Sequence, residues 1–107
     1  MFIIHQYFDD TLRFIVRATI PVEDGNKMVK DQNFLKTLEA YINKTKAEAS
    51  YFYESRGFRT FTFIIDMKGA DEIPSIAEPL FQRYNARVEF HPVMVLADLK
   101  KAIKSIG

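Results

Sequence analysis

The residue pair in this sequence best suited to proton transfer is His91 and Glu89. One position separates them in the stretch from Arg87 to Val93, where apolar and polar side chains alternate. In an extended strand this spacing places both side chains on the same face. An imidazole exchanges protons near neutral pH, and a neighbouring carboxylate can orient the ring. The two residues are the candidate catalytic pair, although a histidine on a strand also serves as a structural hydrogen-bonding group.

Arg17, Thr62 and Asp66 are candidate ligand-binding residues, because they occupy polar positions of two further alternating stretches. A guanidinium holds an anionic group through paired hydrogen bonds, while a hydroxyl and a carboxylate supply a polar wall. We expect Arg17 and Glu89 on neighbouring strands with the same facing, where they would form a cross-strand pair. The same charges also fit a solvated sheet face or a salt-bridged interface.

Other site chemistries have no counterpart in the sequence. The chain has no cysteine and only two histidines, His5 and His91, so we expect no structural metal site. No serine stands in a nucleophile-elbow pattern, and the four glycines form no phosphate-binding loop. We therefore expect neither a metal nor a cofactor.

The candidate residues are carried by segments with the periodicity of strands. Alternation of apolar and polar residues predicts strands at about 12–22, 58–67 and 87–93. The aromatic segment 51–54 predicts a further strand, joined to the one at 58–67 by a turn at 55–57. Residues 23–26 are rich in turn formers, so we expect a loop there.

Helical periodicity predicts three helices, at about 33–48, 73–84 and 97–105. Pro79 is expected to kink or split the second helix, and Asn85 is expected to end it in a left-handed conformation. The last helix is expected to pack on the body through its apolar residues, which are Leu99, Ala102, Ile103 and Ile106.

The predicted order is β-α-β-β-α-β followed by a helical tail, which is an α+β arrangement typical of the ferredoxin-like fold. Right-handed crossovers place the first and third strands at the centre of a four-stranded antiparallel sheet. The helices are expected on one face, over Val16 and Phe63 among others. The opposite face, which carries the candidate site, is left without a covering helix.

The length of 107 residues predicts one domain at 12–107, preceded by an extension at 1–11. Fifteen basic and fourteen acidic residues give a net charge of +1, so no bulk charge attracts nucleic acid or an anionic membrane. No apolar run is long enough to span a bilayer, and the N-terminus lacks the basic region of a signal peptide. We expect a cytoplasmic protein with no membrane or nucleic-acid partner.

Three segments resemble a family of small, mostly bacterial, uncharacterised proteins; they are 19–26, 73–79 and 88–94. That family is similar in layout to the dimeric α/β-barrel superfamily, in which two ferredoxin-like sheets pack face to face. The resemblance implies a homodimer that binds a small molecule or acts as a cofactor-independent enzyme of the monooxygenase or isomerase type. It equally admits a non-catalytic dimerising or regulatory module, because a fold alone does not select a reaction.

A partial match to the RNA-recognition-motif signature lies at 56–63, and that fold shares the predicted strand order. The match holds at Arg56, Gly57, Phe58 and Phe63, whereas Thr60 replaces the second stacking aromatic. Because the net charge is only +1, RNA binding is the less favoured interpretation.

Overall fold

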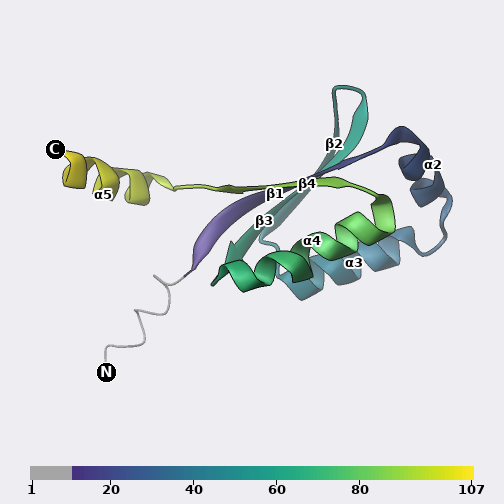
Figure 1. Cartoon of the computed structure of the whole chain (residues 1–107), viewed down its shortest axis with the longest axis horizontal. Coiled ribbons are helices and arrows are strands. Elements are labelled where there is room, and N and C mark those ends of the chain that lie inside the picture. Colours follow the sequence, from purple (N-terminus) through teal and green to yellow (C-terminus); the bar gives the residue numbers. More distant parts are fainter. Residues whose placement is uncertain (1–10) are drawn as a thin grey trace.

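The computed structural model describes residues 11–107, so the predicted N-terminal extension, apart from Thr11, lies outside the described residues. The strands are β1 (Leu12–Ile20), β2 (Ala49–Ser55), β3 (Phe58–Met67) and β4 (Arg87–Pro92). The helices are α2 (Val22–Lys30), α3 (Phe34–Thr45), α4 (Ile73–Tyr84) and α5 (Leu96–Ile106), with a short 3-10 turn, η1 (Ala70–Glu72), before α4. Together they form an α+β domain (Figure 1).

The four strands form one antiparallel sheet in the order β2-β3-β1-β4. The sequence correctly predicted that the first and third strands are central. Arg17 lies opposite Thr62 on β3 and opposite Glu89 on β4. Two positions before Arg17 on β1, Ile15 lies opposite Ile64 of β3 and opposite His91 of β4. This register decides which side chains meet on each face.

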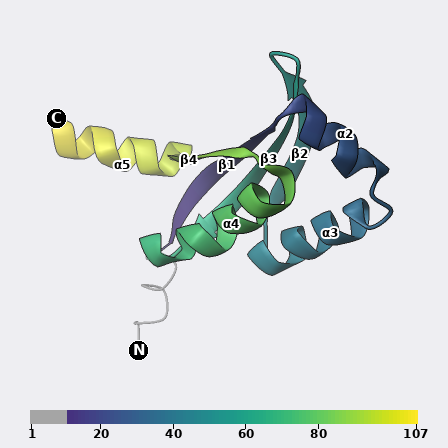
Figure 2. The ribbon, with the colours of Figure 1, turned by 45° about the vertical axis from the view of Figure 1, so that its right-hand side comes forward.

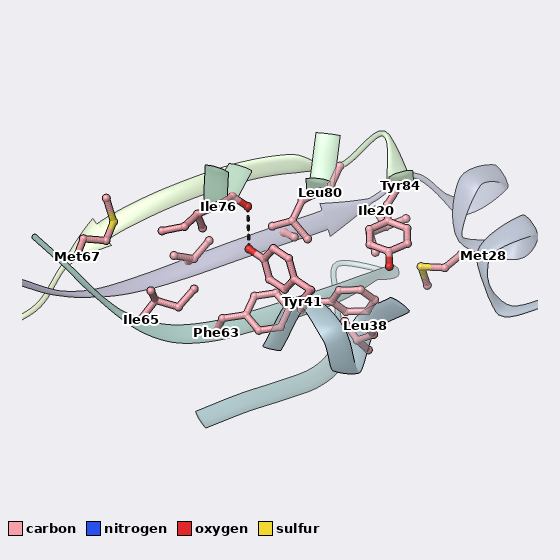
Figure 3. Packing of buried hydrophobic residues seen from close by; sticks show 14 residues of the cluster. Ile20, Met28, Leu38, Tyr41, Phe63, Ile65, Met67, Ile76, Leu80 and Tyr84 are labelled. Carbon is pink, nitrogen blue, oxygen red and sulfur yellow. Dashed lines mark hydrogen bonds between the residues drawn. The ribbon is translucent and has the colours of Figure 1, made fainter. Parts of the chain in front are cut away.

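Helices α3 and α4 cover one face of the sheet, as both views of the ribbon show (Figures 1 and 2). Strand alternation directs the apolar residues of β1 and β3 toward these helices. The core contains Val16, Ala18 and Ile20 of β1, Phe61, Phe63, Ile65 and Met67 of β3, and Leu38, Tyr41, Ile76, Leu80 and Tyr84 of the helices (Figure 3). Burial of these side chains is the main force that holds the helices on the sheet.

A polar contact crosses this core. The hydroxyl of Tyr41 donates a 2.8 Å hydrogen bond to the carbonyl oxygen of Ile76 (Figure 3). Burial, with a smaller contribution from Tyr84, raises the pKa of the Tyr41 hydroxyl well above its ordinary value. Burial also raises the pKa of Tyr84, and the neighbouring charge of Arg83 opposes that shift. Both hydroxyls therefore stay protonated at neutral pH.

Residues 22–30 form the helix α2, so the loop predicted at 23–26 is wrong. Glu23 and Asp24 favour turns, but here they occupy the first helical turn, where the helix dipole favours negative charge. Gly25 is buried against Arg59, and a Cβ at this position would lie 2.6 Å from Nη1 of that arginine. The glycine thus allows α2 to approach the β3 side chain closely.

Pro79 lies inside α4 without splitting it. One backbone hydrogen bond is lost at a proline, and the burial of Ile76, Leu80 and Tyr84 against the sheet outweighs that loss. Asn85 ends the helix with a φ of 53°, which confirms the predicted left-handed cap.

The last helix, α5, does not pack on the body, contrary to the prediction. It projects beyond the end of β4 in both views (Figures 1 and 2), and its apolar residue Ile106 is 81% exposed. The Cα radius of gyration, 16.5 Å, accordingly exceeds the value of about 13 Å expected for a compact domain of this length. Among residues 11–107, no helix has the length and apolar character needed to cross a membrane.

Candidate functional site

The sheet face opposite α3 and α4 carries the candidate residues, and we call it the uncovered face. The register arranges its side chains in rows across the strands. One row contains Tyr51, Thr62, Arg17 and Glu89, and the next contains Ala49, Ile64, Ile15 and His91. The structure therefore brings Arg17, Thr62 and Glu89 together, with His91 in the adjoining row.

His91 and Glu89 form a loose pair at the β4 edge of this face. Nε2 of His91 lies 3.9 Å from Oε2 of Glu89, and the two side chains are 58% and 42% exposed. This separation is longer than a hydrogen bond. The imidazole is open to solvent and is not packed under a helix, so it remains accessible for proton exchange.

Arg17 and Glu89 are opposite each other, but within residues 11–107 no ion pair joins them. The arginine of β1 that does form an ion pair is Arg13, whose Nε lies 2.8 Å from Oε1 of Glu48. Arg17 therefore keeps its hydrogen-bonding capacity available for another group.

Asp66 lies at the other end of the uncovered face. It is opposite Arg13, four positions along β3 from Thr62, a distance of about 13 Å in an extended strand. It borders a separate hollow of about 430 Å³ that also receives Lys44, Lys46 and Lys68. The structure thus separates Asp66 from the group formed by Arg17, Thr62 and Glu89.

Tyr53 engages Thr62. Its hydroxyl and that of Thr62 are 2.6 Å apart and share a hydrogen bond. Because Tyr53 lies opposite Thr60 and reaches Thr62, its side chain runs along this part of β3. Thr60 is only 1% exposed although it belongs to the uncovered face, and its hydroxyl donates to the carbonyl of Phe58. The side chain of Tyr53 thus covers part of the stretch of β3 that carries Thr60 and Thr62.

A hollow of about 500 Å³ lies where the β2–β3 hairpin extends past the end of β1. Its charged lining residues are Arg17, Arg56, Arg87 and Glu89, and we call it the arginine hollow. Its polar uncharged lining residues are Thr19, Ser55 and Asn85. The position follows from the register, because Thr19 is opposite Arg87 in the row next to that of Arg17 and Glu89.

Sequence reasoning selected Arg17 and Glu89 from this hollow but not Arg87 or Arg56. Arg87 stands two positions before Glu89 on the same strand, so alternation alone could have added it to the site. Arg56 lies in the hairpin turn, where no periodicity indicates the direction of a side chain. Its place in the hollow follows only from the folded hairpin.

The segment that resembles an RNA-recognition motif offers little stacking surface. Phe61 and Phe63 point into the core and are 4% and 0% exposed. Only Phe58 of the three phenylalanines in this segment is exposed. Within residues 11–107, no group of three or more histidine, aspartate or glutamate side chains is placed to hold a metal ion.

Comparisons with known proteins give a fold and no activity. No family model matches the sequence, and no curated protein matches it. Among solved structures, the uncharacterized protein TM1266 from Thermotoga maritima is similar, with a TM-score of 0.52 and 11% sequence identity. The match covers 78% of this chain and 99% of that chain. At such low identity the likeness shows the fold alone.

Proposed function

We propose that this chain is a homodimeric α/β-barrel protein, in which the uncovered faces of two sheets pack together and enclose a site for a small molecule. The strand order supports this proposal, because a central first and third strand with helices on one face is the ferredoxin-like arrangement. The helix α2 is an addition to that arrangement and lies beyond the end of β1 (Figure 1).

The observation that carries the proposal is the apolar centre of the uncovered face. Ile15 and Ile64 lie directly opposite each other there, with Tyr51 exposed in the adjoining row and Tyr53 exposed in the row after that. A sheet face that remains in water is ordinarily polar. An apolar and aromatic centre with charged residues around it is instead the usual composition of a protein interface.

The arginine hollow supports the ligand-binding part of the proposal. A second sheet packed on the uncovered face would cover it. Glu89 lines it and His91 lies in the adjoining row, so the loose pair could add a proton-transfer step to binding. The competing function is a non-catalytic dimerising module, in which side chains of the second copy fill the hollow.

The mass of the protein in solution tests the assembly. We expect sedimentation equilibrium at micromolar concentration to give twice the 12.5 kDa mass of one chain. Ile15→Lys should convert the dimer to a monomer, because burying an unpaired ammonium group at the centre of the interface is costly. Circular dichroism should show that the variant keeps its secondary structure, since the changed side chain is outside the helix-covered core.

Leu35→Lys is the matched control. Leu35 is an exposed aliphatic residue of α3, on the opposite layer of the molecule, so its replacement should leave the dimer intact. A wild-type mass of one chain would overturn the proposal. A dimer that survives Ile15→Lys would show that the subunits meet through a different surface.

A further inference from the structure

The arginine hollow carries positive charge that the described chain does not neutralise. Arg17, Arg56 and Arg87 take part in no ion pair and no side-chain hydrogen bond within residues 11–107. Glu89 is the single carboxylate among the lining residues, and the basic side chain that it approaches is His91, at 3.9 Å. Three arginines against one glutamate leave an excess of two positive charges.

This excess charge favours an anion. Like charges that share a hollow repel one another, and a bound anion replaces that repulsion with attraction. Arg17 is half-buried between Thr62 and Glu89 on a central strand, so water screens its charge less than that of a surface arginine. The planar guanidinium matches the paired oxygens of carboxylates and phosphates.

The hairpin turn provides an independent indication. Arg56 and Gly57 both have positive φ, 55° and 85°, as the two central residues of a type I′ turn require. Asparagine or glycine is the favoured residue at the first of these positions, and an arginine there is conformationally unfavourable. Arg56 is therefore unfavourable for the backbone conformation of the turn, but it places a guanidinium beside the hollow.

We infer that the arginine hollow binds a small molecule through a doubly charged oxyanion group, held by Arg17 and Arg87 and approached from the hairpin by Arg56. A phosphate monoester and a dicarboxylate both match the two excess charges. Pro21 and Phe58 offer apolar surface to the rest of the ligand. The volume of about 500 Å³ lies within the range of small-molecule sites, roughly 300–1,000 Å³. This inference rests on the proposed ligand-binding function, but all these residues belong to one protomer.

Calorimetric titration of the full chain with phenyl phosphate, phthalate and phenol tests the ligand class. Phenyl phosphate or phthalate should bind, whereas phenol, which has no charged group, should not. The tighter of the two anions identifies the group as a phosphate ester or a dicarboxylate. Arg17→Met should weaken binding about tenfold or more, as expected for the loss of charged hydrogen bonds. Arg83→Met on α4 is the matched control and should bind like the wild type.

Arg56→Asn separates a role in binding from a role in folding. Asparagine suits the turn better than arginine, so the melting temperature should rise while the affinity for the anion falls several-fold. A residue with only a structural role would not change stability and binding in opposite directions.

Three outcomes would overturn the inference. The first is a wild-type protein that binds neither anion, and the second is equal binding by Arg17→Met and Arg83→Met. The third is binding of a single-stranded RNA oligonucleotide in place of both small anions. Sedimentation of the same samples tests the dimer independently of anion binding. A monomer that binds the anion would contradict the proposed dimer but would support the anion site.

Discussion

The hydroxyl of Tyr41 and the carbonyl oxygen of Ile76 are joined by a 2.8 Å hydrogen bond that links α3 to α4 beneath the sheet. These helices come from separate parts of the chain, and both contribute residues to the apolar core. The bond therefore fixes the relative position of the two elements that cover the core. It also leaves the buried hydroxyl of Tyr41 with a partner.

Replacing Tyr41 with Phe should lower the free energy of unfolding by about 1 kcal/mol, the usual net value of such a hydrogen bond. The ring that packs on Phe63 remains, so the loss comes from the hydroxyl. Urea unfolding followed by circular dichroism measures the change. Ser105→Ala, which removes an exposed hydroxyl that donates to a carbonyl of α5, should leave the midpoint unchanged. Equal effects of the two substitutions would contradict this account.

Stability should fall in alkaline solution. Burial raises the pKa of Tyr41 in the folded chain above its unfolded value of 10.0, so the folded state retains the proton more strongly. The contribution of the protonated Tyr41 hydroxyl to the free energy of unfolding is fully present below about pH 10, and it is lost as the pH rises toward the pKa of the folded state. The urea midpoint should therefore decrease as the pH rises above about 10. Tyr41→Phe should show a smaller decrease, and an identical pH dependence in both proteins would exclude this tyrosine as the cause.

Removal of residues 94–107 should leave the domain folded. The helix α5 projects from the body, and the backbone of Val93 still donates to the carbonyl of Arg13 in the shortened chain. We expect thermal unfolding to show a stability change within about 0.5 kcal/mol, the usual range for changes away from the core. Leu80→Ala provides the contrast, since truncation of a buried leucine costs about 2–5 kcal/mol. A truncated chain as unstable as Leu80→Ala would mean that α5 packs on the body.

The sequence predicted the sheet well because its signals are local. The bounds of β3, the left-handed end of α4 at Asn85 and the central position of β1 follow from alternation, from residue preference and from the handedness of crossovers. The candidate site followed from the same alternation as far as Arg17 and Glu89, whose facing is set by their strands.

The remaining features depend on contacts between distant segments. The helix α2 forms from residues that favour turns, and Gly25 lets it approach Arg59 of β3 closely. The apolar stripe of α5 predicted a packed helix, but a stripe does not specify the surface that receives it. Arg56 reaches the hollow only because the hairpin extends past the end of β1, and no short-range pattern encodes that length.

The central position of β1 has a consequence for the newly synthesised chain. Both of its partners follow later, since β3 comes after two helices and a strand, and β4 comes after α4. At a synthesis rate of roughly 5–20 residues per second, β1 emerges from the ribosome seconds before β3 can pair with it. During this interval Val16, Ala18 and Ile20 have no core in which to pack. The unpaired backbone groups of β1 can then form hydrogen bonds with other chains. The order of the strands thus leaves β1 without its partners for longer than any other strand of the sheet.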